Sequence, residues 1–311
     1  MNRFKTQVIV NPESNRGRTR RRWKEIKEAL RSQIREFRYE FTEKPLQAIE
    51  ISREAVRSGH DLIIGVGGDG TMNEIANGFF ENRRIINPDS ALGILPSGTG
   101  CDLTKSLGIP ARLKDALKVI TEAPSAAMDV GRVSFRDNSG LETERFFLNV
   151  SDFGVGGEVV KRVNDRRLQR KASSYVRCLV SAMANYRSRK IRIRVDGREL
   201  PEDEYLIGAI ANGRIFGKGM KIAPQAKLDD GLLDLVLVKS MRFFEFCRHG
   251  WRIFLGTHLS HPKISLVRGE TFEAVAVEEG NVLLELDGEQ LGRLPAKFEI
   301  LPRILRIKGY I

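Results

Sequence analysis

Two patterns of hydrophobic positions follow one another along the chain. Up to about residue 125, short apolar runs alternate with segments whose apolar residues recur every three or four positions. The strand-like runs are TQVIVNP, FRYEFTE, DLIIGVG and ALGILP. The helix predicted after the first run carries a stripe of Trp23, Ile26, Leu30, Ile34 and Phe37. This alternation predicts a parallel sheet that is covered by helices.

The pattern changes near Ala126. The segments AMDVGRVSF and TERFFLNV flank the turn DNSG like the arms of a hairpin. Further strand-like segments follow, while helices are expected only near 173–187 and 242–256. We therefore predict two domains: an α/β domain with a parallel sheet over 1–126, and a mainly antiparallel β-sandwich over 127–298. The segment 299–311 is expected to return to the first domain.

Charge adds a possible partner to this picture. Among 311 residues, 52 Lys and Arg outnumber 40 Asp and Glu, which gives a net charge of +12. The basic residues concentrate in RGRTRRRWK, KRVNDRRLQRK and RSRKIRIR. Such segments are either solvated faces or a surface for a polyanion, which would be nucleic acid or an anionic membrane. Because no recognition-helix pattern accompanies them, nucleic acid is the less favoured partner.

Location is indicated by cysteine usage and hydropathy. The three cysteines are odd in number and far apart, which is typical of a reducing compartment. No apolar run approaches the length that a membrane span needs. We therefore expect a cytoplasmic protein.

Two glycine-rich loops follow consecutive predicted strands, IIGVGGDGTMNE (63–74) and LPSGTGCDL (95–103). The carboxyl ends of parallel strands share one edge of a sheet, so both loops should lie there. Glycine lets the backbone approach a ligand closely, and N–H groups at a helix start favour an anion. Asp69 would repel a phosphate unless a cation stood between them. The two loops therefore predict a nucleotide polyphosphate with magnesium.

Two other phosphate motifs fit less well. The pattern G-x-G-x-x-G at 65–70 would suggest a dinucleotide-binding dehydrogenase, but it follows the third predicted strand. It also lacks a convincing acidic residue at the end of the next strand. A P-loop is excluded because no Gly-Lys-Ser/Thr occurs after the glycines.

The segments GGDGTMNEIANGF and LGILPSGTGCDLTKSLGIP together resemble the catalytic domain of the diacylglycerol kinase family. The superfamily also contains sphingosine kinases and NAD kinases. NPESNRGR (11–18), GKGMKIAPQAKLDDGLLDLVLV (217–238) and LELDGEQL (284–291) are similar to further family signatures, so the likeness covers nearly the whole chain. It best fits the bacterial soluble lipid kinases. The resemblance implies an NAD-kinase-like fold and transfer of the γ-phosphoryl group of ATP to a lipid hydroxyl, with diacylglycerol as the first choice.

The resemblance also implies roles for individual residues. Glu289 would be the general base that takes the proton of the substrate hydroxyl, with Asp287 and Asp69 near magnesium and the reacting groups. A second magnesium would be held by Asp230 and the backbone carbonyls of Lys227 and Leu232. The ATP site would be lined by Asn11, Pro12, Glu13, Ser14, Asn15, Thr42, Gly67, Gly68, Asp69, Gly70, Thr71, Met72, Asn73 and Thr99.

The chain departs from the family pattern at three places. Cys101 stands where asparagine is usual, which puts the geometry of the second glycine loop in doubt. Asn15 replaces a usual glycine, and Lys218 interrupts a glycine run. Cys101 also lies at a predicted helix N-terminus, which would lower the pKa of its thiol.

Some motifs have a plain structural alternative. LDGE, taken alone, predicts a hairpin turn rather than a catalytic site. His258 and His261 lack an evident third ligand, so they are expected to be structural or surface residues rather than zinc ligands. A further aromatic series is expected either in the core or along an acyl-chain groove, and comprises Phe243, Phe244, Phe246, Trp251 and Phe254.

Phosphoryl transfer is compatible with these residues on chemical grounds. It asks mainly for positioning and charge neutralisation. A glutamate with a pKa of about 4.3 would accept the hydroxyl proton late, as the O–P bond forms.

The sequence thus predicts a cytoplasmic lipid kinase that associates peripherally with an anionic membrane. Its partners would be that surface and the lipid substrate, without nucleic acid, and a homodimer is left open. The alternatives are a kinase for another lipid, a sphingoid base or NAD, a catalytically silent lipid- or nucleotide-binding homologue, and a nucleic-acid-binding protein.

Overall fold

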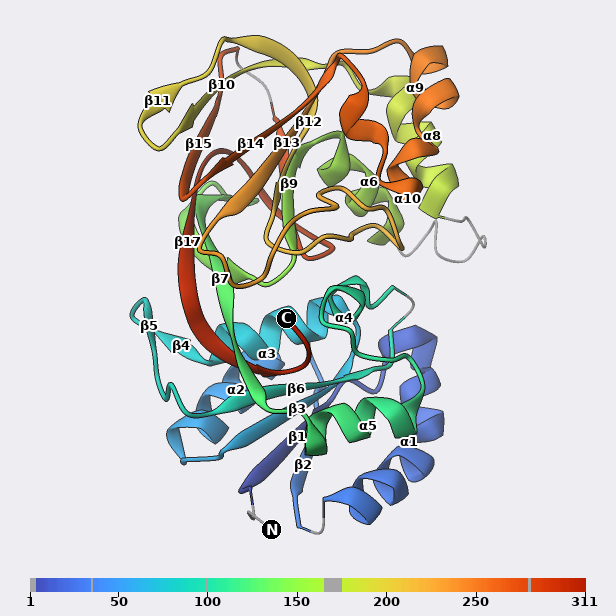
Figure 1. Ribbon diagram of the computed structural model, residues 1–311, viewed down its shortest axis with the longest axis vertical. Coiled ribbons are helices and arrows are strands. Elements are labelled where there is room, and N and C mark those ends of the chain that lie inside the picture. The colour runs from blue at the N-terminus through green and yellow to red at the C-terminus, as the bar shows by residue number, and fades with distance from the viewer. Residues whose placement is uncertain (1–3, 35, 99, 165–174, 279–280) are drawn as a thin grey trace. The chain divides into compact units, whose positions relative to one another are not determined.

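The computed structural model describes residues 4–34, 36–98, 100–164, 175–278 and 281–311. The chain forms two compact units, a first unit of Met1–Val130 with Pro302–Ile311 and a second unit of Gly131–Leu301. The predicted boundaries at 126 and 298 lie close to these limits, and the C-terminal segment belongs to the first unit. The chain passes between the units along β7 (Ser125–Asp137) and β17 (Glu289–Lys308) (Figure 1).

The first unit contains a sheet in the order β6–β3–β1–β2. These strands are Thr6–Val10 (β1), Arg38–Phe41 (β2), Leu62–Gly67 (β3) and Ala91–Pro96 (β6), and each neighbouring pair runs parallel. The end of β17 adds a further parallel pairing beside β6. Every residue of β1 and β3 is buried, as expected for strands that helices cover.

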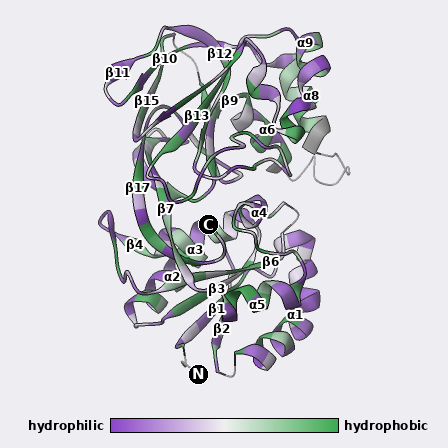
Figure 2. Ribbon diagram, viewed as in Figure 1, coloured by the Kyte–Doolittle hydropathy of each residue, from purple (hydrophilic) through white to green (hydrophobic). Residues whose placement is uncertain are grey.

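The helices of this unit are α1 (Ser14–Gln33), α2 (Gln47–Arg57), α3 (Asp69–Gly78), α4 (Asp102–Ser106) and α5 (Leu113–Glu122). α1 packs with α5, and α2 packs with α3. Figure 2 shows α1 as largely hydrophilic, and it buries Ile26 and Leu30. The predicted stripe was too long, because the backbone is already extended at Ile34 and Phe37 lies beyond the helix. A short hairpin of β4 (Phe80–Glu81) and β5 (Arg84–Ile85) was not predicted.

The second unit is mainly β-structure. Its strand pairs with an assigned residue register are all antiparallel. Its core contains Phe147, Phe153, Phe272 and Phe298. The face-to-face packing of two sheets, which a sandwich requires, stays a prediction. Besides parts of β7 and β17, the strands are β8 (Glu142–Phe147), β9 (Val150–Gly154), β10 (Arg189–Val195), β11 (Arg198–Glu199), β12 (Asp203–Ala211), β13 (Leu233–Lys239), β14 (Ile264–Gly269), β15 (Thr271–Ala276) and β16 (Leu283–Leu286).

Helices interrupt the strands of the second unit. The helices expected near 173–187 and 242–256 correspond to α8 (Tyr175–Asn185), α9 (Phe243–His249) and α10 (Arg252–Leu255). α6 (Val155–Asn164) was missed, because Gly156 and Gly157 in its first turn argue against a helix. Its Val155 and Val159 pack against α8. No helix within the described ranges is long and apolar enough to cross a membrane.

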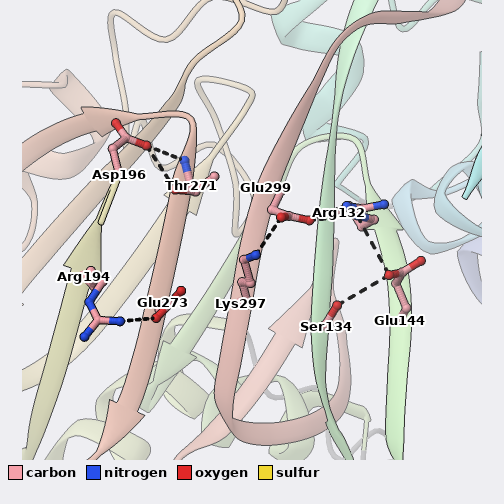
Figure 3. Close-up of polar contacts among 9 residues, drawn as sticks. All are labelled: Arg132, Ser134, Glu144, Arg194, Asp196, Thr271, Glu273, Lys297 and Glu299. Carbon is pink, nitrogen blue, oxygen red and sulfur yellow. Dashed lines mark hydrogen bonds and ion pairs between the residues drawn. The ribbon is translucent and has the colours of Figure 1, made fainter. Parts of the chain in front are cut away.

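In the basic strand β10, apolar and cationic residues alternate between the two faces. Ile191, Ile193 and Val195 are buried, while the cationic side chains between them face outward. Each outward cation meets a glutamate, and Figure 3 shows Arg194 beside Glu273 at 3.2 Å. The other pairs are Lys190–Glu202 at 3.3 Å, Arg192–Glu202 at 2.9 Å and Arg194–Glu199 at 3.0 Å. This face is therefore largely neutralised by its own neighbours.

Candidate active site

The two glycine loops meet at the carboxyl edge of the parallel sheet, as predicted. The Ser97 amide after β6 donates to the Gly67 carbonyl at the end of β3, with an N···O distance of 2.8 Å. Gly68 and Gly98 lie backbone against backbone, since a Cβ on Gly98 would come within 2.6 Å of the Gly68 Cα. A side chain at this crossing would push the loops apart.

Two further loops join the same edge. After β1, the Asn11 amide donates to the Val66 carbonyl at 3.0 Å, and the Asn11 Nδ2 donates to the Thr71 Oγ1 at 3.0 Å. After β2, the Thr42 amide donates to the Val10 carbonyl at 2.9 Å. The predicted nucleotide residues that follow β1, β2 and β3 are thus held together by hydrogen bonds between neighbouring strand ends.

The loop after β1 has an unusual backbone. Asn15, Arg16 and Gly17 have φ values of 52°, 57° and 73°, so three successive residues are left-handed. Asparagine tolerates this region better than most residues do, which explains how Asn15 can stand where glycine is usual. In the same loop Pro12 is buried, and exposed Glu13 forms an ion pair with Arg20 at 2.6 Å.

Ser14 and Ser97 are linked through buried Thr19. The Thr19 hydroxyl lies 2.5 Å from the hydroxyl of each serine. The loop after β1 is therefore tied to the loop after β6, and Thr19 and Ser97 are positioning residues that the sequence pattern did not identify.

Asp69 begins α3 and connects it to α4. Its carboxylate accepts the backbone amides of Asp102 at 3.1 Å and Leu103 at 3.4 Å. Asp102 is buried and pairs with Lys105 at 2.6 Å. An acidic residue so close to Asp69 was not assigned from sequence, although its place in the second glycine loop was a usable signal. Asp69 thus holds the start of α4 next to the glycine crossing.

Other predicted nucleotide residues point into the core. Met72 is buried and packs under Gly65, where a Cβ would lie 2.6 Å from the methionine sulfur. Asn73 is buried and its Oδ1 accepts the Asn77 Nδ2 at 3.0 Å. These two side chains support α3 rather than line an open surface. Thr99 lies outside the described residues.

The expectation of a lowered pKa for Cys101 is wrong. Burial and the neighbouring Asp69 carboxylate raise the pKa of the thiol to about 11. The α4 helix is only five residues long, so its N-terminus does not offset these effects. The residue is left-handed, with φ 49°, and its Sγ accepts the Gly98 amide at 3.3 Å. Cys101 is therefore a structural thiol and no nucleophile.

In the second unit, the LDGE segment is both a hairpin turn and a cluster of acidic groups. Leu286 pairs with Glu289, and the two central residues, Asp287 and Gly288, have positive φ as a type I′ turn requires. Glu289 is half-buried at the start of β17. The local interpretation as a turn is thus correct, and it places the proposed base at a fixed corner.

Asp287 anchors this corner to the start of β9. Its carboxylate accepts three backbone amides, from Leu148 at 2.9 Å, Asn149 at 3.0 Å and Val150 at 3.1 Å. Three such bonds fix the orientation of this carboxylate. The structure therefore gives Asp287 a positioning task that the resemblance did not imply.

A buried carboxyl pair supports the same corner. Asp152 of β9 and Glu285 of β16 are register partners and are only 1% and 3% exposed. Burial raises the pKa of both groups, that of Asp152 to about 7. Their mutual hydrogen bond lowers the pKa of Asp152 and raises that of Glu285. Glu285 also accepts the Gly288 amide at 2.9 Å.

The predicted second magnesium site lies in the turn before β13. The Asp230 Oδ1 accepts the Leu232 amide at 3.2 Å, which closes the turn that begins near Lys227. Within the described residues, no cluster of three or more His, Cys, Asp or Glu side chains could hold a metal. This site would depend on one carboxylate and backbone carbonyls, and it stays a prediction.

His258 has the structural role expected of it. Its ring is buried, and its Nε2 lies 3.0 Å from the Ile222 carbonyl. Burial lowers the pKa of this imidazole, so the neutral form is favoured at neutral pH. His261 instead contacts His249, with ring centroids 5.1 Å apart and the ring planes tilted by 56°.

Comparisons with known proteins agree with this arrangement. Residues 5–133 match the family model of the diacylglycerol kinase catalytic domain, and residues 149–309 match that of the YegS C-terminal NAD kinase beta sandwich-like domain. A Staphylococcus aureus protein named diacylglycerol kinase is 28% identical over 97% of this chain and 91% of its own length. A Mycobacterium tuberculosis protein of the same name is 28% identical over 81% and 78%.

Solved structures show the same fold. A candidate diacylglycerol kinase from Bacillus anthracis strain Sterne has a TM-score of 0.77 at 25% identity, covering 100% of this chain and 99% of its own. Yeast NADH kinase, in complex with NADH, has a TM-score of 0.54 at 13% identity, covering 99% of this chain and 83% of its own.

Proposed function

Because the chain belongs to the family in which a diacylglycerol kinase catalytic domain precedes a YegS C-terminal NAD kinase beta sandwich-like domain, we propose that it phosphorylates diacylglycerol. The γ-phosphoryl group of ATP would be transferred to the free hydroxyl, giving phosphatidic acid. The relatives named diacylglycerol kinase support this acceptor.

The observation that carries the proposal is the crossing of Gly68 and Gly98. Two bare backbones meet there, directly before the first turn of α3, where amide groups favour an anion. Phosphoryl transfer needs positioning and charge neutralisation more than covalent chemistry, and such an edge supplies the positioning. We assign the nucleotide to this edge, held by the loops that contain Asn11, Thr42 and Thr71.

Glu289 is proposed as the general base. The acceptor oxygen would form the new bond to the γ-phosphorus while the bond to the ADP oxygen breaks, and the hydroxyl proton would pass to the Glu289 carboxylate. The Asp287 anchor and the Glu285–Gly288 bond support this role, because they fix the turn from which Glu289 projects. A fixed base loses less orientational freedom when the acceptor arrives.

Magnesium fits the residues that are present. Mg²⁺ is commonly bound through one or two carboxylates together with phosphate oxygens. Asp69 and Asp102 would hold it in the first unit, since a carboxylate that accepts backbone amides keeps lone pairs for a metal. The ion would supply charge neutralisation at the phosphates. Lys227, Asp230 and Leu232 would hold a second ion in the second unit.

We also propose where the enzyme works. Diacylglycerol resides in a bilayer, so a cytoplasmic kinase must reach a membrane surface to meet it. The net charge of +12 suits an anionic membrane.

Transfer of radiolabelled phosphate to diacylglycerol in mixed micelles tests the proposal. Glu289→Gln should lower the rate by about 100-fold or more, the scale of general-base catalysis, while thermal stability and ATP affinity stay near wild type. Glu270→Gln, at an exposed glutamate of the same unit, should keep the wild-type rate. Wild-type turnover by Glu289→Gln would refute the assigned base.

A panel of acceptors separates the alternatives. Diacylglycerol, a sphingoid base and NAD are offered with ATP and magnesium, with and without micelles. NAD belongs in the panel because the fold is shared with a yeast NADH kinase. Labelling of NAD without micelles would redirect the assignment, and labelling of none of them would indicate a silent homologue.

A further inference from the structure

An aromatic surface lies on two short helices of the second unit. Phe244, Trp251 and Leu255 are 75%, 58% and 60% exposed, and Phe243 and Phe254 are exposed as well. We call these five residues the exposed aromatic face. They lie on α9, on α10 and at the joint between them, and Figure 1 shows both helices on the same side of the unit as α8.

These side chains are not needed to attach the helices. α9 is anchored by Phe246, which packs against the core cluster that contains Ala182 and Met183 of α8. α10 is anchored by Ile253, which packs against the cluster that contains Ile222 and Ala223. The sequence analysis expected five aromatic residues of this segment in a core or a groove. Of these five, only Phe246 packs into the core. The other apolar side chains are exposed to solvent. Such a cluster of exposed apolar side chains marks an interaction surface.

The charge around this face is positive. Arg242, Arg248 and Arg252 lie between or beside the aromatic residues in the sequence RFFEFCRHGWRIFLG. The one acidic residue of that stretch, Glu245, is bound by Lys263 at 2.7 Å and approaches His261 at 3.6 Å. The hydrogen bond from Lys263 lowers the pKa of Glu245, which stays ionised and neutralised in place. A partner that is complementary to the exposed aromatic face must therefore be both apolar and anionic.

We propose that the exposed aromatic face inserts into the headgroup region of an anionic lipid bilayer and holds the enzyme on the membrane. Tryptophan and phenylalanine suit this depth, and flanking arginines meet lipid phosphates. Helices of seven and four residues lie in the interface and do not span it. The inference rests on the proposed function in one respect, because it explains how a kinase without a spanning helix in its described residues reaches diacylglycerol.

Tryptophan fluorescence tests insertion directly. The chain has two tryptophans, so Trp23→Phe leaves Trp251 as the sole reporter. Trp23 contacts the rings of Tyr39 and Phe41 in the first unit, in tilted and edge-to-face arrangements, and phenylalanine preserves an aromatic ring there. Phosphatidylglycerol vesicles should shift the Trp251 emission to the blue and protect it from iodide, and phosphatidylcholine vesicles should do so less. An unchanged spectrum with phosphatidylglycerol would overturn the proposal.

Vesicle sedimentation tests the surface by mutation. Phe244→Ser combined with Leu255→Ser should weaken binding to phosphatidylglycerol vesicles at least tenfold. Leu141→Ser is the matched control, since Leu141 is 68% exposed in the same unit but lies at the turn between β7 and β8. Equal binding of the double variant and the control would contradict the assigned surface.

Catalysis on a dissolved substrate and self-association can each be measured apart from membrane binding. A short-chain diacylglycerol in free solution should be phosphorylated equally by wild type and the double variant. If neither phosphorylates it, the proposed function fails while the vesicle result still decides the surface. The exposed aromatic face could instead bind a second copy of this chain, and sedimentation velocity without lipid tests this alternative. A wild-type dimer that becomes a monomer in the double variant would assign the face to self-association.

Discussion

Asp152 and Glu285 face each other across β9 and β16, buried from solvent, and burial raises the pKa of both carboxyls. Two ionised carboxylates on neighbouring strands, buried away from water, would repel each other strongly. The doubly ionised state of the pair is therefore disfavoured. Glu285 also holds the Gly288 amide, next to the proposed base. The protonation of this pair is therefore coupled to the turn that presents Glu289.

The pair predicts that stability falls as pH rises. Both folded-state pKa values are raised by burial above the unfolded value of about 4, so the folded state binds more protons. The stabilisation is complete below about pH 4 and is lost as pH rises through about 7. Between about pH 5.5 and pH 8, Asp152 alone should lower the free energy of unfolding by about 2 kcal/mol, and the raised pKa of Glu285 should add to this drop.

Urea unfolding at the two pH values measures this effect. Glu285→Gln mimics the protonated acid and should reduce the dependence by the share of Glu285, whereas exposed Glu270→Gln should leave it unchanged. A full wild-type slope in Glu285→Gln would show that the pair is not its source.

Asp287→Ala should cost more stability than any change at Glu289. It removes the acceptor of three buried backbone amides, which predicts a loss of about 2–4 kcal/mol. Asp287→Asn keeps one acceptor oxygen, so its loss of stability should lie between that of Asp287→Ala and zero. Thermal unfolding checks the order, with Glu289→Gln as the control that stays within about 0.5 kcal/mol of wild type. Equal melting of Asp287→Ala and wild type would contradict the anchor.

Gly98→Ala should weaken nucleotide binding at least tenfold. Its Cβ would lie 2.6 Å from the Gly68 Cα, so the two loops must separate. Gly59→Ala is the matched control, because its Cβ would meet nothing within 4 Å. That control has φ 70° and should lose about 1 kcal/mol of stability while keeping its ATP affinity. Calorimetric titration with ATP and magnesium distinguishes the two, and equal affinities would argue against the crossing as the phosphate site.

Cys101 should resist alkylation. With a pKa of about 11, its thiolate fraction at pH 8 is on the order of a thousandth. In a Cys247→Ser variant, which removes the exposed cysteine, iodoacetamide at pH 8 should label the folded protein slowly. Peptide mass spectrometry locates the label, and fast modification of Cys101 would contradict the raised pKa.

Cys101→Asn should fold normally, because asparagine tolerates the left-handed conformation found there.

Much of the first unit could be read from local pattern. The parallel strand runs and the glycine loops at their ends depend on residue spacing, which reports local backbone preference directly, and the same holds for the hairpin at DNSG in the second unit. The local pattern also predicted the turn at Asp287–Gly288, whereas the catalytic role that the resemblance implies for this segment stays a prediction. Where local signals conflicted, prediction failed: the glycines at 156–157 hid α6, and the apolar stripe of α1 continued past its true end.

The sequence by itself determined which segments form strands, which loops lie at the carboxyl edge, and which family the chain resembles. Only the tertiary structure decided that Asp69 binds the start of α4, that burial reverses the expected shift at Cys101, and that Asp152 meets Glu285. It also decided that Phe244 and Trp251 face outward while Phe246 does not. Burial and pairing between distant residues arise from packing and strand register, and residue spacing along the chain does not encode either in a form that can be read locally.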